Sequence, residues 1–187
     1  MAITLKRILK EDRQEVLTLV KSRIDSKSNV CLTTNLVNLK WYSDVLTRPE
    51  TYDRTHRIFG LYEDTKLHTI IVLNLQSNVY VVSMVIKDQA ASTIMVNGYE
   101  KHTTELIDFA IREMEKEGLT TFYSAIPNHP KWKKSDKNPN RIIKNEYTIE
   151  EVELIPAGEL PVIPFHFTMI TRPFSLDMVI RKFTKNV

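Results

Sequence analysis

The segment from Val79 to Ile126 constrains the fold more than any other part of the chain. It contains an apolar run over residues 79–86, a polar stretch, a long amphipathic stretch that begins near Gly98, and a second apolar run over residues 120–126. An extended apolar run predicts a buried strand, and apolar residues at three- and four-residue spacing predict a helix. Strand, loop, helix and strand in that order form a crossover unit. Because a helix start offers free backbone N–H groups, the loop before it is where an anionic cofactor would dock.

Composition limits the class of protein. The chain has 187 residues, 42% of them apolar, so it can bury one core, and we expect a single domain over residues 1–187. Its formal net charge of +3 is too small to indicate nucleic-acid binding by itself. Cys31 is the only cysteine, which excludes an intramolecular disulfide and fits a reducing compartment. No stretch of about 18 apolar residues occurs, so we expect a cytoplasmic protein without a membrane partner.

The first half of the chain alternates between strand and helix patterns. Residues 3–9 predict a strand, and Glu11 and Asp12 then place acid in the first turn of a helix. Residues 34–46 predict a second helix, which Pro49 ends. Two more strands, over residues 57–62 and 67–75, are joined by a turn at residues 63–66 and lead into the run described above. The apolar face of the first helix is expected at Val16, Leu17, Val20 and Ile24.

The second half is less regular. The central helix is predicted from about Tyr99 to Glu117, with Gly118 as its terminator. Residues 127–140 contain three prolines and predict an irregular loop. Strands are expected over residues 147–155 and 165–171, and a closing helix over residues 176–183. The buried face of the central helix is expected at Thr103, Leu106, Ile107, Ala110, Ile111 and Met114.

This element order resembles that of the GCN5-related N-acetyltransferase (GNAT) superfamily over most of the chain. The opening residues 3–19 and the strand-turn-strand around residues 62–67 are similar to the corresponding parts of that family. The resemblance implies a mixed α/β fold with a twisted, mainly antiparallel central sheet flanked by helices. It also implies acetyl-CoA as the cofactor and an amine, on a small molecule or on a protein, as the acceptor.

The resemblance also assigns residues to the cofactor site. Met84, Val85 and Ile86 would line the pantetheine arm, and residues 89–98 would face the pyrophosphate. Within that loop Gln89 matches the family pattern, but the glycines that usually follow it are absent, and Gly98 is the nearest one. The remaining polar contacts would come from Asn97 in the loop and from Asn128, which follows the last strand of the crossover.

Acetyl transfer requires a group that removes a proton from the amine and another that protonates the thiolate. The candidates are Glu63, Tyr80 and Tyr123, although each can also be explained as an ordinary turn or strand residue. Ile142 occupies the position of the tyrosine that usually acts as acid in the family, and Glu146 replaces a usual glycine. The histidines show no metal-ligand spacing, so we expect no metal site.

The irregular segment is the most basic part of the chain. This basic segment and the missing glycines after Gln89 suggest two alternative functions. One is a catalytically inactive GNAT-fold protein that binds a protein assembly partner, in a phage-encoded setting or in a virion. The other, ranked last, is a nucleic-acid binder, because no recognition motif accompanies the basic residues. The basic residues lie on both sides of Trp132 in the sequence and are Lys131, Lys133, Lys134, Lys137, Arg141 and Lys144.

Overall fold

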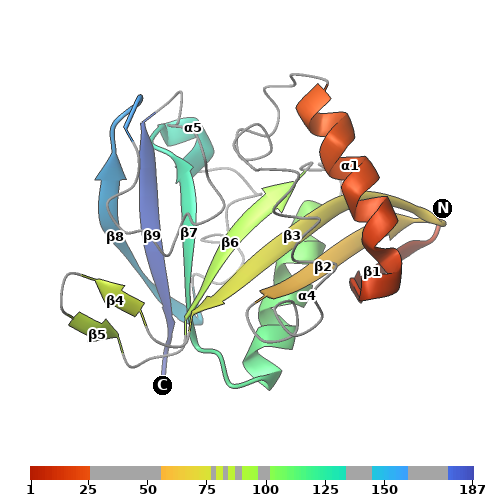
Figure 1. Cartoon of the computed structure of the whole chain (residues 1–187). Coiled ribbons are helices and arrows are strands. Elements are labelled where there is room, and N and C mark those ends of the chain that lie inside the picture. The colour runs from red at the N-terminus through yellow and green to blue at the C-terminus, as the bar shows by residue number, and fades with distance from the viewer. Residues whose placement is uncertain are drawn as a thin grey trace.

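The protein is built around a mixed β-sheet with helices on both faces (Figure 1). The computed structural model describes residues 1–25, 56–76, 79–81, 84–86, 90–96, 102–133, 145–159 and 177–187. Its helices are η1 (Lys10–Asp12), α1 (Arg13–Asp25), α4 (Thr103–Lys116) and α5 (Pro130–Lys133). The strands of the main sheet are β1 (Ile3–Arg7), β2 (His56–Glu63), β3 (Lys66–Gln76), β6 (Ala90–Val96), β7 (Thr121–Pro127), β8 (Tyr147–Ile155) and β9 (Met178–Lys185).

The strands of the main sheet follow the order β1-β2-β3-β6-β7-β9-β8. Neighbouring strands are antiparallel except for β6 and β7, which are parallel. The parallel pair is joined by the crossover through α4, as its sequence pattern predicts. The predicted fold class, a mixed α/β domain with a mainly antiparallel central sheet, is confirmed.

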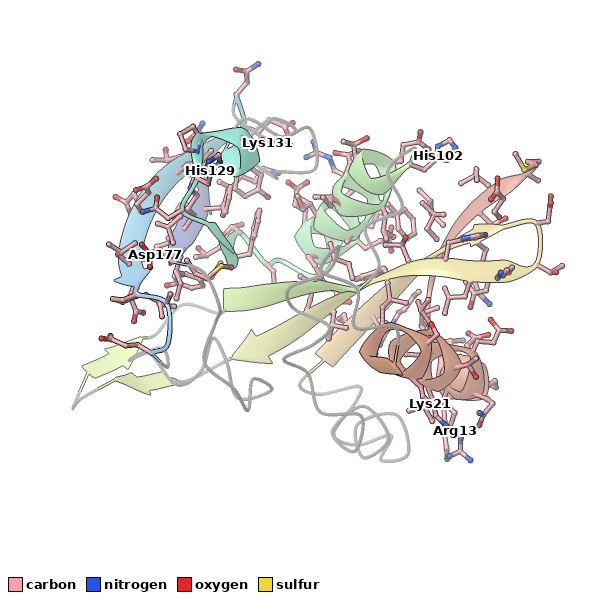
Figure 2. All side chains as sticks on the ribbon, turned by 90° about the horizontal axis from the view of Figure 1, so that it is seen from above. Arg13, Lys21, His102, His129, Lys131 and Asp177 are labelled. Atoms are coloured by element: carbon pink, nitrogen blue, oxygen red, sulfur yellow. The ribbon has the colours of Figure 1, made fainter. Side chains whose placement is uncertain are left out.

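The middle of β3 is buried on both faces of the sheet. Ile70, Ile71, Val72 and Leu73 are each nearly inaccessible to solvent. Residues at odd and even positions point to opposite faces, so an unbroken apolar run requires a cover on each side. Helix α4 covers one face and α1 the other, and both views agree on this arrangement (Figures 1 and 2).

Helix α4 fills its face of the sheet with the side chains that the sequence pattern indicated. Leu106, Ile107, Ala110, Ile111 and Met114 join one core cluster with Phe59, Phe122 and Phe183. The helix begins at Thr103 rather than near Tyr99. Its C-terminal end is as predicted: Gly118 has a φ of 82°, its N–H donates to Glu115 O, and the Leu119 N–H donates to Met114 O. These two bonds form a Schellman motif that satisfies the last carbonyls.

The N-terminal strand and helix are confirmed. Val16 is fully buried on α1, and the Leu9 N–H donates to Asp12 Oδ2 at 3.1 Å ahead of the helix. The side chains of Val20 and Ile24 lie outside the described set, as does the helix predicted over residues 34–46.

The segment that contains Val79–Ile86 differs from its prediction. It is two short strands, β4 (Val79–Val81) and β5 (Met84–Ile86), which pair with each other in a separate two-stranded sheet. The strand that enters the main sheet is Ala90–Val96, where the sequence predicted a loop. This strand assignment was wrong because two strand-forming stretches lie in succession here, and the more apolar one is not the one that pairs with β3.

The end of the chain also differs. Residues 178–185 form the strand β9 between β7 and β8, so the predicted closing helix over residues 176–183 is wrong. A short apolar run fits a buried strand as well as a buried helix, and pairing on both edges selected the strand. The strand predicted over residues 147–155 is confirmed at both ends, whereas residues 165–171 lie outside the described part. Residues 130–133 form the helix α5 within the stretch predicted as a loop.

Candidate functional site

The parallel strands β6 and β7 pair over only part of their length. Their register runs from Ala90 opposite Thr121 to Thr93 opposite Ser124. Beyond that rung β6 continues to Val96 and β7 continues to Pro127. We call the point at Thr93 and Ser124 the fork.

The outer neighbours of the two strands explain why the fork stays open. β6 remains paired with β3 up to Val96, which lies opposite Ile70. β7 remains paired with β9 up to Pro127, which lies opposite Met178. Each strand therefore follows a different neighbour, and Figure 1 shows β6 and β7 diverging toward their C-terminal ends. Past the fork, the described register no longer pairs β6 with β7.

The N-terminus of α4 follows the C-terminal end of β6 in the chain. Its N-cap residue, His102, makes no side-chain capping hydrogen bond. The first intrahelical bond runs from the Leu106 N–H to His102 O at 3.2 Å, and His102 Nδ1 lies 2.9 Å from Oε1 of Glu105. Figure 2 shows His102 at the end of the helix. The N–H groups of the first turn have no carbonyl acceptor within the helix and lie at the positive end of its dipole. Anions commonly bind at this position.

The C-terminal end of β7 is tied to the start of β9. The Asn128 N–H donates to Asp177 O at 2.8 Å, and Asp177 Oδ1 accepts from the Ala157 N–H at 2.8 Å. Next to it, the Lys131 N–H donates to His129 Nδ1 at 3.1 Å at the start of α5. Figure 2 shows His129 just before α5 and Lys131 within it, with Asp177 near the start of β9. These bonds hold the exposed Asn128 at the end of the strand that forms one arm of the fork.

A buried arginine lies beside the fork. Arg181 on β9 is the register partner of Ser124 on one side and of Glu151 on the other. Its side chain is 8% exposed, and its Nη2 donates to Glu151 Oε1 at 3.1 Å. A buried guanidinium normally needs such a carboxylate. The residue pattern alone did not distinguish Arg181, because two charged residues, Arg181 and Lys182, stand between Ile180 and Phe183.

The three catalytic candidates do not lie together. Tyr123 is buried on β7, one residue before the fork. Glu63 lies at the end of β2, opposite Ile3 of β1 and Lys66 of β3, and therefore two strands away from β6. Tyr80 belongs to the separate β4-β5 pair, and its side chain is outside the described set. Of the three, Tyr123 alone is on a strand of the fork.

The residues predicted for the cofactor are also divided. Met84, Val85 and Ile86 form β5, outside the main sheet, which corrects their placement on a strand next to the crossover helix. Gln89 precedes the start of β6 in the chain, whereas Asn97 and Gly98 follow its end; these three lie outside the described residues. Asn128 is placed at the end of β7, as described above.

A cluster of charged groups lies at the opposite end of α4. Glu115 Oε1 accepts from the Tyr147 hydroxyl at 2.7 Å and lies 3.1 Å from the Lys185 ammonium and 3.0 Å from the Arg112 guanidinium. Burial alone would raise the pKa of Glu115, but these three donors hold it below its ordinary value. Burial raises the pKa of the Tyr147 hydroxyl, and its bond to Glu115 raises it further. With Tyr147 at the start of β8 and Lys185 at the end of β9, this cluster joins the helix to the sheet.

The described residues contain neither a metal-ligand cluster nor a membrane-spanning helix. No group of three or more histidine, cysteine, aspartate or glutamate side chains in this part of the chain could hold a metal ion. No helix within the described residues is long and apolar enough to cross a membrane.

The fold is that of known acetyltransferases. No protein-family model matches the sequence, and no curated protein matches it. Among solved structures, an N-acetyltransferase from Staphylococcus aureus Mu50 is 10% identical, with 98% of this chain and 99% of that chain covered at a TM-score of 0.63. An acetyltransferase of the GNAT family from Streptococcus pneumoniae is 10% identical, with 97% and 98% covered and a TM-score of 0.60. The putative acetyltransferase yncA from Salmonella typhimurium, solved with acetyl-CoA, is 10% identical, with 98% and 94% covered and a TM-score of 0.58. The chain therefore has the GNAT fold.

Proposed function

We propose that this chain binds acetyl-CoA in the fork between β6 and β7 and transfers the acetyl group to an amine. The observation that carries the proposal is the fork itself, in which two parallel strands stop pairing at Thr93 and Ser124 while each keeps its outer neighbour. The similar protein yncA, which was solved with acetyl-CoA, supports the choice of cofactor.

The chemistry of the fork fits the pantetheine arm of that cofactor. Pantetheine contains two amides, and amides pair with strand edges through N–H and C=O groups. The backbone of β6 from Ile94 to Val96 and of β7 from Ala125 to Pro127 offers such groups past the fork. A ligand that pairs there would satisfy groups that the described register leaves without a strand partner.

The pyrophosphate would lie at the N-terminus of α4. The first turn of α4 offers backbone N–H donors that carry partial positive charge, and the N-cap side chain does not accept from them. These donors belong to Thr103, Thr104 and Glu105. Asn97 and Gly98, which belong to the connection between β6 and α4, would provide the remaining contacts. We retain Asn128 as a contact to the arm, because it follows β7 directly. Gln89 and residues 84–86 are not retained, because they precede β6 rather than follow it.

When bound, acetyl-CoA would supply an activated thioester. The chain must then orient the amine and move its proton. Tyr123 is the candidate for that role, since it is on β7 next to the fork. Its residue partners in the register are Ser92 on β6 and Lys182 on β9, so it lies in the row immediately before the strands separate.

Calorimetric titration of acetyl-CoA and of free coenzyme A into the purified protein tests binding. We expect saturable heat for both ligands, and loss of at least about tenfold in affinity for Gly98→Val, because a side chain would prevent close approach of backbone and phosphate. The matched control is Val152→Ser, an exposed position on β8 that should leave the affinity unchanged. Absence of heat at high micromolar acetyl-CoA would remove the proposal.

Turnover is tested separately. Release of coenzyme A thiol, measured with a panel of polyamines, amino acids and lysine-containing peptides, should identify the acceptor class. Tyr123→Phe should lower kcat by about 10²-fold or more with little change in cofactor affinity, which is the usual contribution of one general acid or base. Equal kcat in the two proteins would exclude Tyr123 from proton transfer.

A second candidate function is a GNAT-fold binding protein without catalysis. It is favoured by the connection between β6 and α4, where Gly98 is the only glycine among residues 97–102. Saturable binding of coenzyme A without turnover of any acceptor would support this function. A defined acceptor with steady-state turnover would eliminate it.

A further inference from the structure

Strand β8 lies at one edge of the main sheet. Among the described strands it pairs only with β9, over Tyr147–Ile155. An edge strand presents a row of backbone N–H and C=O groups to whatever approaches it, and proteins usually shorten, cover or charge such edges. At nine residues β8 is longer than a typical strand, and most of its residues are exposed.

The edge is acidic although the whole chain carries a net positive charge. Residues 145–159 include glutamates at 146, 150, 151, 153 and 159 and contain no lysine or arginine. Glu146 bonds to Arg112 and Glu151 bonds to Arg181. Glu150 is exposed, opposite Lys182 in the register.

Exposed aliphatic side chains follow the glutamates along the same strand. Leu154 is 57% exposed and Val152 is 41% exposed, and both belong to the small group of large apolar residues that face solvent in the described part of the chain. Charges alone would protect an edge from pairing; exposed Leu and Val beside them do not serve that purpose. The combination instead matches a surface that recognises a segment with both basic and apolar residues.

A bulge divides the strand into two parts. The register with β9 shifts between Glu151 and Glu153, so that Val152 is the extra residue. The five residues Tyr147–Glu151 form an uninterrupted ladder, while residues 153–155 form a shorter one. A partner strand would pair mainly with the longer, acidic ladder and extend its apolar end over Val152 and Leu154.

We propose that the outer edge of β8 binds an extended, lysine- and arginine-containing segment of another protein, which adds a strand to the sheet. Main-chain hydrogen bonds would hold the segment, and the exposed Glu150 together with Leu154 would select its sequence. A second copy of this chain does not fit the edge, because antiparallel pairing of β8 with itself brings glutamates close to glutamates. The site is distinct from the fork, since β9 separates β8 from β7.

Fluorescence anisotropy with the whole protein tests the proposal. The probe is a fluorescein-labelled peptide, Val-Leu-Thr-Lys-Val-Arg-Lys, amidated at its C-terminus. One control peptide carries glutamate in place of each basic residue. A second keeps every side chain but has N-methyl groups on alternate amides, which removes backbone donors. We expect saturable binding of the probe, no binding of the glutamate peptide, and at least about tenfold weaker binding of the N-methyl peptide, because its methylated amides cannot donate ladder hydrogen bonds to the strand.

Two variants test the position of the site. Glu150→Lys should weaken binding by about fivefold or more, because a repulsion replaces an exposed attraction. Leu154→Ser should weaken it through lost apolar contact, and circular dichroism should show that both variants are folded. Hydrogen exchange of the wild-type protein should slow over Tyr147–Glu151 when the probe is bound.

Three results would overturn the proposal. Equal affinity for the probe and its N-methyl form would mean attraction by charge without strand pairing. Unchanged affinity of Glu150→Lys would place the peptide elsewhere. A dimer in light scattering that Leu154→Ser dissociates would mean that a second copy occupies the edge.

Discussion

The hydroxyl of Tyr147 lies 2.7 Å from Oε1 of Glu115 and donates to it from the first residue of β8. Tyr147 is buried and its ring packs edge-on against Phe122, so the hydroxyl has a fixed direction. A hydrogen bond to a charged acceptor contributes about 1.5–3 kcal/mol. Tyr147→Phe should lower the free energy of unfolding by about 1.5 kcal/mol, at the low end because Arg112 and Lys185 still contact the carboxylate. Urea unfolding at pH 7 measures this difference.

The contacts of Glu115 with Tyr147, Arg112 and Lys185 predict that the free energy of unfolding depends on pH. The folded-state pKa of Glu115 is below its ordinary value. A carboxyl group with a lowered pKa stabilises the fold above its unfolded pKa of about 4.3, and this stabilisation is lost as the pH falls through the folded pKa. The difference in unfolding free energy between wild type and Glu115→Gln should therefore be largest near pH 7 and shrink below about pH 4. A difference that grows as the pH falls would contradict the assigned charge state.

Strand β9 offers a test of the corrected secondary structure. Phe183 is fully buried and stacks on Phe122 with ring centroids 4.5 Å apart and planes inclined by 2°. The next residue, Thr184, is exposed, as strand alternation requires. Phe183→Ala should cost about 3–5 kcal/mol in unfolding free energy, while Thr184→Ala should stay within about 0.5 kcal/mol of wild type. Comparable losses at both positions would mean that the side chains of Phe183 and Thr184 do not lie on opposite faces of the sheet.

The sequence predicted those elements whose pattern has only one physical interpretation. The apolar spacing of residues 106–114 fits a helix and no strand, and Gly118 marks its end. Strand β8 was predicted with both its ends. The incorrect predictions concerned short apolar runs. Residues 178–180 and 79–86 are apolar enough for a helix, a central strand or a separate hairpin, and only pairing with other strands decides among them.

The fork could not be read from residue types. Beyond Thr93 and Ser124, β6 remains paired with β3 and β7 remains paired with β9, while β6 and β7 no longer pair with each other. The fork is therefore a property of the register among four strands. The sequence did predict that the crossover unit would place the start of the central helix after a strand, and this arrangement is confirmed with Ala90–Val96 as the strand. Arg181 was missed because a charge inside an apolar run indicates burial only once its partner Glu151 is known.

The end of α4 depends on a left-handed residue. Gly118 has a φ of 82°, which side chains with a Cβ adopt at a cost. Gly118→Ala should lower the free energy of unfolding by about 1 kcal/mol, and Gly118→Asn by less, because asparagine tolerates this conformation better. Among the described residues other than its two chain neighbours, none has an atom within 4 Å of the position that a Cβ at residue 118 would occupy, so a larger loss for Gly118→Ala would have to come from the backbone rather than from a clash. Thermal and urea unfolding of the two variants provide the comparison.

Gly60 is favoured for a different reason, the limited space next to its Cα. A Cβ at this position on β2 would lie 2.6 Å from Cδ1 of Ile8 and 2.9 Å from Cδ1 of Leu67. Both atoms are ends of side chains and can move, so Gly60→Ala should be tolerated at a cost of about 1–3 kcal/mol, the usual cost of overpacking. Because the closer contact is to Cδ1 of Ile8, its removal should relieve the crowding.

Ile8→Val removes that methyl group and by itself should cost about 0.5–1.5 kcal/mol. In the Ile8→Val background, the further change Gly60→Ala should cost less than it does in the wild-type protein, and the two single losses should exceed the loss of the double variant by about 1 kcal/mol, because residues in contact couple by 0.5–3 kcal/mol. Urea unfolding of all four proteins gives the coupling energy. Additive losses would mean that the crowding at Gly60 is relieved by Leu67 or by a shift of β2, and that Ile8 packs less closely against β2 than the 2.6 Å approach indicates.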